Sequence, residues 1–580
     1  MSAAWWRPAA MAYVVAAALL LLVGAGSIAA ARYPDPDDVL RLVEVRDLIA
    51  GQGWFDLTQH RLDAPNGGVA MHWSRLVDLP LAGLIVALAP LLGQATAETV
   101  AAVAVPLLTF GCALLLVGRQ AARLCGPATV LYACLALALS VPVLAQVLPL
   151  RIDHHGWQIV LALAALAGVL ARDSGRGGWL AGIALAAWLS ISLEGLPMTA
   201  AVGGVLALRW LRDPADKAGF VNAMLGLAVA SGALFALTRG FGDLANHCDA
   251  ISPVYLAVFA GAAAGALALS RFAPRNRVAL AAGLGALAAG GAAILLALEP
   301  RCAGGGFAGM DPLVERFWYR GIAEGQPLWQ QPLGAVLPAL VPPLLGLWGV
   351  HALWRGAAAG KERAAWLDYA LLLGAALAVA LFVTRAGAVA GAYAAIPLGW
   401  LVRRWLARLR AARPAVQGTV ALAALALALV MALPGARPWQ QRSAQSPAPA
   451  AAKRAAECQV AEAAPVLAAL PRGEILAPMD IGPRLLLDTP HTVVASAHHR
   501  GEKGMRFAIE TFLGTPETAR ATLAERGTAY VALCADSNEI ARFRSAAPAG
   551  FAAQLADGQA FGWLEPVRTG SNLQLWRIAG

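Results

Sequence analysis

Residues Leu148–Val160 read LPLRIDHHGWQIV and place four charged or titratable side chains between two apolar runs. Arg151, Asp153, His154 and His155 stand almost side by side, and a long apolar run follows directly. Ionisable groups are costly near hydrocarbon, so they usually have a structural or a chemical reason to be there. An aspartate suits the N-terminal cap of the helix that follows, but two imidazoles add nothing to a cap. The stretch therefore favours a chemical site at the surface of a membrane.

The rest of the chain indicates a membrane protein. Its 580 residues are 59% hydrophobic and 14% charged, with a mean hydropathy of +0.61, whereas about 25% of residues in soluble domains are charged. Apolar runs of roughly 17 to 22 residues recur through the first three quarters, and each is long enough to cross a bilayer. The first lies within Met1–Ala31 and is too long for the core of a cleavable signal peptide. We interpret it as the first span.

The basic residues predict how the chain crosses the bilayer. The net charge of +10 comes from short Lys/Arg clusters between apolar runs, of which RRWLARLRAAR (Arg403–Arg413) is the densest. Such clusters mark cytoplasmic loops, and nothing else in the sequence indicates nucleic acid. Placing them inside gives about 13 crossings, a cytoplasmic N-terminus and an external C-terminus. Pro80–Gly93 is short and bounded by proline, so we expect a helix that lies at the external face or dips into it.

These crossings predict a polytopic α-helical membrane domain over residues 1–434, a linker over 435–455 and an external domain over 456–580. The linker is rich in Pro, Ala, Gln and Ser. In the external domain, EILAPMD, HTVVASA and AYVALCA have the composition of short buried strands, and PETARATLAERG that of a helix ended by glycine. We expect a small α/β domain there.

Four of the seven cysteines fall outside the membrane in this topology. An even number suits disulfides in an oxidising compartment. From this topology we hypothesise one disulfide between Cys248 and Cys302 and one between Cys458 and Cys534, because the two members of each pair lie on the same side of the linker.

Three external segments gather acidic residues. The first, YPDPDDVLRLVEVRDLIAG, contains Asp35, Asp37 and Asp38; the second is the opening stretch; the third, FWYRGIAEGQPLWQQP, contains Glu324. Carboxylates with an imidazole suit Mn²⁺ or Mg²⁺, and Arg385, which begins another span at the same face, suits a phosphate. The alternatives are an acidic helix cap at Asp35–Asp38, an ordinary loop glutamate at 324, and an arginine that reaches to the membrane interface.

These segments resemble the catalytic subunit of oligosaccharyltransferase, in its bacterial and archaeal single-subunit form, among the C-type membrane glycosyltransferases (GT-C). DPDDVLRLVEVRDLIAG resembles the DxD region of that family and puts Asp37 at its essential aspartate. RIDHHGW resembles the second acidic motif and puts Asp153 and His155 at metal-binding positions. RGIAEGQPLWQ resembles the SVSE/TIXE loop, and TRAGAVAGAYAAIP the segment whose arginine meets the donor phosphate. The resemblance thus gives Asp37, Asp153 and Glu324 catalytic roles and makes these three and His155 the metal ligands. It assigns Arg385 to the donor phosphate.

The tail departs from that family. Its acceptor signature WWDYG is absent, and PMDIGPRLLLDTP offers only Asp480 and Gly482 at a comparable place. A second feature, ASAHHRGEKGM, has no counterpart in the signature. Its His498, His499 and Arg500 suit contacts with phosphate or sugar hydroxyls, or else form an ordinary surface loop between two strands.

The resemblance implies a metal-dependent glycosyltransferase in the bacterial inner membrane. It would transfer a sugar or an oligosaccharide from a polyprenyl-phosphate or -pyrophosphate donor to an unknown acceptor at the periplasmic face. Two alternatives belong to other classes of protein. One is a transporter or flippase for lipid-linked glycans, for which Glu194 in SLEGLP is the intramembrane candidate. The other is a non-catalytic protein of envelope assembly, which leaves the acidic segments unexplained.

Overall fold

The computed structural model describes residues 4–272, 276–411 and 458–579. Its chain divides into two compact units. The described residues of the first lie within 1–32, 73–308 and 324–440, and those of the second within 33–72, 309–323 and 441–580. The predicted linker and the crossing predicted just before it lie outside the described residues.

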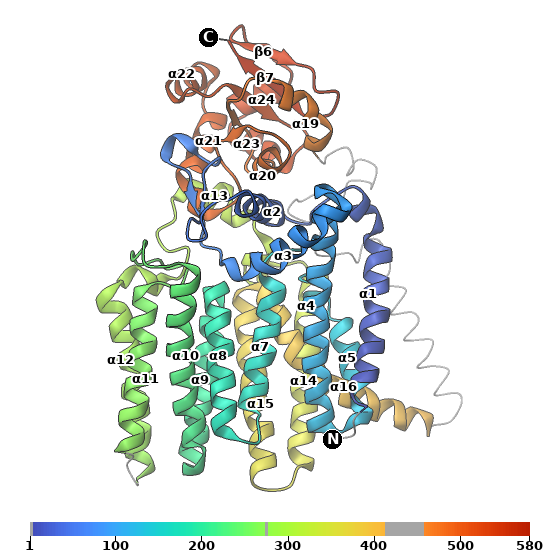
Figure 1. Cartoon of the computed structure of the whole chain (residues 1–580), viewed down its shortest axis with the longest axis vertical. Coiled ribbons are helices and arrows are strands. Elements are labelled where there is room, and N and C mark those ends of the chain that lie inside the picture. The colour runs from blue at the N-terminus through green and yellow to red at the C-terminus, as the bar shows by residue number, and fades with distance from the viewer. Residues whose placement is uncertain (1–3, 273–275, 412–457, 580) are drawn as a thin grey trace. The chain divides into compact units, whose positions relative to one another are not determined.

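The first unit is a bundle of long apolar helices (Figure 1). Nine helices in the described part of the chain are long and apolar enough to cross a membrane. Helices outside this set of nine, among them α7 (His155–Val169), α8 (Ser174–Ile191) and α9 (Leu196–Arg212), stand between them. This confirms the prediction of a multi-pass helical membrane protein. The other helices of the bundle are α1 (Trp6–Ala29), α3 (Arg75–Leu92), α4 (Gln94–Cys125), α5 (Val130–Ala138), α6 (Val141–Leu144), α10 (Lys217–Thr238), α11 (Pro253–Arg271), α12 (Arg277–Leu298), α14 (Leu333–Gly356), α15 (Lys361–Phe382) and α16 (Gly387–Arg410).

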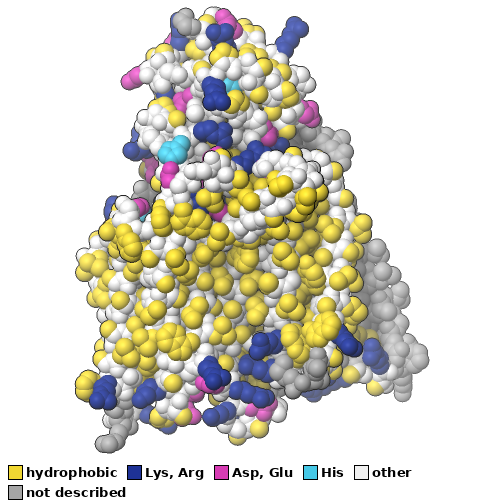
Figure 2. Space-filling model, in the orientation of Figure 1, with side chains coloured by type: hydrophobic (Ala, Val, Ile, Leu, Met, Phe, Trp, Pro, Cys, Tyr) yellow, Lys and Arg dark blue, Asp and Glu magenta, His cyan; other side chains and the backbone are white. Residues whose placement is uncertain are grey.

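The surface of the bundle has the composition of a lipid-facing surface. Figure 2 shows hydrophobic side chains over the broad middle of the helices, with Lys and Arg gathered at one end. Large apolar side chains such as Leu22, Val23 and Val278 are mostly exposed. A bilayer would bury such an apolar belt favourably, whereas its exposure to water would be unfavourable.

Small residues let the helices around the candidate site approach closely. Helix α8 packs against both α7 and α10. A Cβ atom at Gly178 would overlap the backbone of Gly219, and one at Gly182 would overlap that of Ala223. Without a hydrophobic driving force in lipid, close backbone packing of this kind is a main source of helix association. This packing fixes the position of α8 and therefore of the turn that follows it.

Helix α3 covers the segment for which we predicted a helix at the membrane surface. It begins at Arg75, earlier than the predicted Pro80, because Ser74 caps it and Arg75 forms a buried ion pair with Asp78 at 3.3 Å. Figure 1 shows it lying obliquely at one end of the bundle. By length and hydropathy it also qualifies as a span.

The second unit contains a five-stranded mixed sheet in the order β4-β3-β5-β7-β6. Strands β3 (Glu474–Leu476), β4 (Thr492–Val493) and β5 (Tyr530–Leu533) lie in the three predicted segments and pair in parallel. The predicted helix is α22 (Pro516–Arg526), and Gly527 ends it with φ +76°. Strands β6 (Leu564–Val567) and β7 (Gln574–Ile578), which add an antiparallel edge, were not predicted.

Helices pack on this sheet around an aromatic core. Phe512, Phe543 and Phe551 are fully buried, and Phe512 stacks on both of the others. They come from α21 (Glu502–Leu513), α23 (Asn538–Ala546) and α24 (Phe551–Ala556). The remaining helices of this part of the chain are α19 (Val460–Ala469) and α20 (Gly482–Asp488). A small α/β domain is therefore present, as predicted.

The acidic first loop is part of this second unit. It contains α2 (Pro36–Ile49) and the hairpin β1 (Thr58–Gln59) and β2 (Val69–Ala70). Backbone bonds join Asp63 N–H to Val493 O at 2.8 Å and Val493 N–H to Arg61 O at 2.9 Å. The Arg526 guanidinium also bridges Asp63, at 2.6 Å, and Glu474, at 2.7 Å. The loop thus extends the β4 edge of the sheet.

Two disulfides close long loops. Cys248 is bonded to Cys302 in the first unit and Cys458 to Cys534 in the second, the same pairs that the topology suggested. The bonded cysteines are 54 and 76 positions apart in the sequence. Closing such long loops by a disulfide removes much of the conformational freedom of the unfolded chain.

The disulfides predict a count of reactive thiols. In denaturant without reductant, a maleimide should label three cysteines per chain, namely Cys112, Cys125 and Cys134. After reduction it should label all seven. Intact-mass spectrometry measures both numbers. Seven labels before reduction would mean that the pairs do not form.

Candidate active site

The segment RIDHHGW forms the turn that starts α7. Asp153, His154 and His155 are all buried. The two oxygens of Asp153 face two imidazoles, with His154 Nδ1 at 2.5 Å and His155 Nδ1 at 2.6 Å. The two rings stack with centroids 4.3 Å apart. Asp153 therefore organises a pair of imidazoles, in keeping with the chemical interpretation of the segment.

A break between α8 and α9 presents Glu194 to the same place. After α8 ends, Ser192 is extended, and a single 3₁₀ turn (Leu193–Gly195) precedes α9. Gln158 Nε2 donates to Glu194 Oε2 at 3.3 Å, and Trp188 Nε1 donates to Gln158 Oε1 at 2.9 Å. His155 Nε2 lies 3.9 Å from Glu194 Oε2. Glu194, which the sequence suggested for a transporter, thus belongs to the Asp153 cluster.

Two further turns bring Glu324 and Arg385 to this cluster. The turn Thr384–Ala386 lies between α15 and α16. Thr384 fixes it against the Glu324 segment, because its N–H and its hydroxyl both donate to Gln326 O, at 3.1 and 2.7 Å. The Arg385 guanidinium forms ion pairs with Glu194 and, at 3.4 Å, with Glu324. Arg151 adds a second cation, 3.7 Å from Glu324.

The charges of the cluster favour ionised carboxylates. Desolvation opposes ionisation of Asp153, Glu194 and Glu324, but the attraction of nearby imidazoles and guanidiniums outweighs it. The imidazoles of His154 and His155 hold the pKa of Asp153 well below its usual range. Arg385 lowers the pKa of Glu194, and Arg151 together with His155 lowers that of Glu324. The site therefore carries three negative groups at neutral pH, balanced by two guanidiniums and two titratable rings.

These residues fit a divalent cation. Ligand atoms of Asp153, His154 and His155 all lie within 4.8 Å of one another, and all three residues are buried. Carboxylate oxygens with imidazole nitrogens suit Mn²⁺ and Mg²⁺ as well as Zn²⁺. A cation bound here would take the place of the proton that Asp153 shares with an imidazole.

Of the candidate site residues of the sequence, seven come together in the first unit: Arg151, Asp153, His154, His155, Glu194, Glu324 and Arg385. Asp35, Asp37, Asp38, Asp480, His498, His499 and Arg500 lie in the second unit. Asp35 is the N-terminal cap of α2 and accepts from Asp37 N–H at 3.0 Å, while Asp38 is fully buried. The cap interpretation thus holds for Asp35. Asp480 follows β3, and its N–H donates to Glu539 Oε2 at 3.2 Å.

The His498 segment lies in a 3₁₀ turn, His499–Gly501, of the second unit. His72, which the sequence did not single out, contacts both histidines there. Arg500 Nη1 donates to Ala70 O at 3.2 Å. A lone histidine in an apolar stretch carries no local signal, so only the fold reveals this group.

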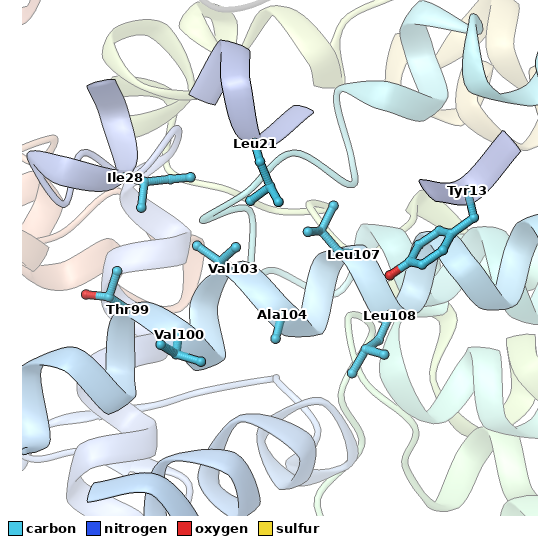
Figure 3. Close-up of a pocket in the computed structure, with 9 residues that line it drawn as sticks. All are labelled: Tyr13, Leu21, Ile28, Thr99, Val100, Val103, Ala104, Leu107 and Leu108. Atoms are coloured by element: carbon cyan, nitrogen blue, oxygen red, sulfur yellow. The ribbon is translucent and has the colours of Figure 1, made fainter. Parts of the chain in front are cut away.

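An apolar hollow of about 450 Å³ lies between α1 and α4 (Figure 3). Its lining is almost wholly aliphatic, with Tyr13 and Thr99 as the polar exceptions. None of the clustered site residues lines it, so this apolar hollow is separate from the candidate site.

No protein-family model and no curated protein matches the chain. Solved structures of the oligosaccharyltransferase AglB from Archaeoglobus fulgidus do. The complex with an inhibitory peptide and a dolichol-phosphate superimposes with a TM-score of 0.65 and 14% identity, over 96% of this chain and 72% of that chain. The chain has the fold of a GT-C oligosaccharyltransferase.

Two other structures, described as the Archaeoglobus fulgidus oligosaccharyltransferase, give the same result. The one tethered with an acceptor peptide containing the NVT sequon has a TM-score of 0.65 and 14% identity, over 100% of this chain and 74% of that chain. The complex with Zn and sulfate has a TM-score of 0.60 and 13% identity, over 98% and 73%. The likeness therefore covers the membrane bundle and the α/β domain together.

Arg385 should contribute strongly to stability because it neutralises two carboxylates at once. We expect Arg385→Gln to destabilise the protein by about 3 kcal/mol, the lower end of the cost of breaking a buried ion pair, because Glu194 and Glu324 are partly exposed. Thermal unfolding of the full chain in detergent measures this.

Arg176→Gln is the matched control. Arg176 pairs with Asp173, but both side chains are largely exposed, so its loss should cost less than about 1 kcal/mol. Equal effects of the two substitutions would show that the Arg385 pairs are solvated and contribute little.

Proposed function

We propose that this protein is a metal-dependent glycosyltransferase that uses a polyprenyl-phosphate- or -pyrophosphate-linked sugar donor. The observation that carries the proposal is the cluster in which Arg385 lies between Glu194 and Glu324, beside Asp153 and His155. The oligosaccharyltransferase fold supports it, because the cluster is formed at the turns between helices of that fold.

The proposed ligands of the cation are Asp153, His155 and Glu324. Asp37 keeps the essential role that the resemblance gives it. When bound, a Mn²⁺ or Mg²⁺ ion would stabilise the negative charge that develops on the departing phosphate. The zinc in one of the Archaeoglobus fulgidus oligosaccharyltransferase structures belongs to that protein and supports only the presence of a divalent cation here.

The residues of the chain supply the rest of the chemistry. Arg385 offers a planar guanidinium, largely buried at 16% exposure, to the donor phosphate. To bind it, the phosphate would compete with Glu194 and Glu324 for the same N–H groups. A carboxylate, Asp37 or Glu324, orients the acceptor nucleophile or removes its proton. The nucleophile bonds to the anomeric carbon as the bond from that carbon to the phosphate oxygen breaks, and the lipid phosphate leaves. Glu194, held by Gln158, keeps Arg385 in place between transfers.

The proposed location is the bacterial inner membrane, with the N-terminus in the cytoplasm and the C-terminal domain in the periplasm. A donor with a long lipid chain explains why the site stands at the ends of membrane helices. The bilayer and the lipid-linked donor are the proposed partners, and no feature favours nucleic acid. The dolichol-phosphate bound to AglB is consistent with a donor of this class.

The catalytic assignment predicts a loss of transfer. Asp37→Asn, Asp153→Asn and Glu324→Gln should each lower transfer from a lipid-linked sugar at least about 100-fold, the scale of losing one transition-state contact. EDTA should abolish activity, and Mn²⁺ or Mg²⁺ should restore it. Asp173→Asn, at an exposed helix cap, is the control and should leave activity unchanged. Full activity in the Asp153→Asn protein would refute the assignment.

The tail predicts the choice of acceptor. Because WWDYG is absent, we propose that an acceptor other than an Asn-x-Thr peptide is used. Purified protein given a lipid-linked sugar should glycosylate such a peptide poorly, in a reaction followed by mass spectrometry. Efficient modification of its asparagine would show that the tail reads a sequon by other residues.

A further inference from the structure

Three histidines of the second unit form a group that the proposed reaction does not use. They are His72, which follows β2, and His498 and His499, which stand at the turn before α21. The ring centroids are 5.0 Å apart for His72 and His498, and 4.8 Å apart for each of the other two pairs. Three imidazoles from opposite ends of the chain thus form a nearly equilateral triangle.

Their nitrogens have the spacing of metal ligands. His72 Nδ1 lies 3.0 Å from His498 Nε2, and a ligand nitrogen of each of the three rings lies within 4.8 Å of the others. Two nitrogens bound to one tetrahedral Zn²⁺ at 2.0–2.1 Å would be about 3.3 Å apart. The three nitrogens therefore lie within about 1.5 Å of the spacing that one ion would require.

The chemistry of the group selects the kind of cation. It consists of three imidazoles, whereas the Asp153 cluster combines imidazole with carboxylate. Nitrogen ligands suit Zn²⁺ and similar transition metals, while Mg²⁺ and Ca²⁺ prefer oxygen. His498 is 2% exposed, and His72 and His499 are partly exposed, so one side of the group is open. Three protein ligands with an open fourth position describe a zinc site that binds water or an anion.

We propose that His72, His498 and His499 bind a transition-metal ion of the Zn²⁺ type, separate from the cation of the Asp153 cluster. The ion would join the first loop to the C-terminal domain. Arg500, whose guanidinium donates to Ala70 O, already makes one such link beside it. A bound ion would therefore hold the loop that contains Asp37 against the sheet, independently of any transfer reaction.

Metal binding by the full-length protein tests this. The protein should be purified with a tag that lacks histidine, stripped with chelator and titrated with Zn²⁺ against a chromophoric competitor, with Co²⁺ absorption as a second signal. We expect a tight Zn²⁺ site that is lost in His498→Ala and in His499→Gln, in addition to any Zn²⁺ bound by the Asp153 cluster. Each substitution should weaken Zn²⁺ binding more than about 100-fold, because removing a direct ligand exceeds the 10- to 100-fold effect of losing an outer-sphere partner.

Matched variants distinguish a zinc site at these histidines from zinc bound elsewhere on the protein. His60→Gln changes an exposed histidine of the same unit, paired with Asp56, and should leave the tight site intact. Asp153→Asn should also leave it intact, so that failure of the proposed reaction and failure of this site remain distinguishable. The partly exposed His499 keeps the test informative if His498→Ala does not fold. In wild-type protein, Zn²⁺ should raise the melting temperature more than in His499→Gln.

Two outcomes would overturn the proposal. One is Zn²⁺ binding by His499→Gln that equals that of the wild type. The other is a wild-type protein that binds inorganic phosphate through these histidines but shows no tight Zn²⁺ site, because the group would then be an anion site.

Discussion

The ion pairs of Arg385 with Glu194 and Glu324 are the interaction on which the candidate site depends. Each of these residues lies in a short turn between helices, and the three turns are far apart in sequence. Three carboxylates gathered within a few ångströms would repel one another, so the cluster needs a central cation. Arg385 supplies that charge with a rigid fork that reaches two partners, and Arg151 adds to it at Glu324.

The bundle is arranged so that these turns meet. Glycines on α8 let its backbone lie directly against α10. This packing fixes where α8 ends and where the turn that contains Glu194 begins. Thr384 ties the turn of Arg385 to the Glu324 segment through two bonds to one carbonyl. Packing and hydrogen bonds thus hold the residues that would bind a phosphate and a divalent cation. These contacts form without either ligand. A site built in this way is ready to exchange internal ion pairs for ligands of the same charge.

Local patterns in the sequence explain what could be predicted. Long apolar runs and basic clusters predicted a polytopic helical protein, and three short apolar segments with turn residues predicted the parallel strands. Asp153, His155, Glu324 and Arg385 could be selected because their segments lie at one predicted membrane face and resemble motifs of one family in the same order. Strands β6 and β7 were missed because their sequences, LEPV and QLWRI, alternate weakly and include charged residues.

Contacts across the sequence explain what could not be predicted. Glu194 resembled an intramembrane transporter residue because its partner, Arg385, is nearly two hundred positions away. The first loop belongs to the C-terminal domain through Asp63 and Val493, a pairing that no local pattern encodes. His72 is one histidine in a short stretch and gains meaning only beside His498 and His499.

The most direct test of the central claim is to locate bound Mn²⁺ in the protein by anomalous diffraction, with polyprenyl phosphate present. The account predicts a manganese peak in contact with Asp153 and His155, and a phosphate group within hydrogen-bond distance of Arg385. Manganese that binds elsewhere, with Arg385 still paired to Glu194 and Glu324, would contradict it.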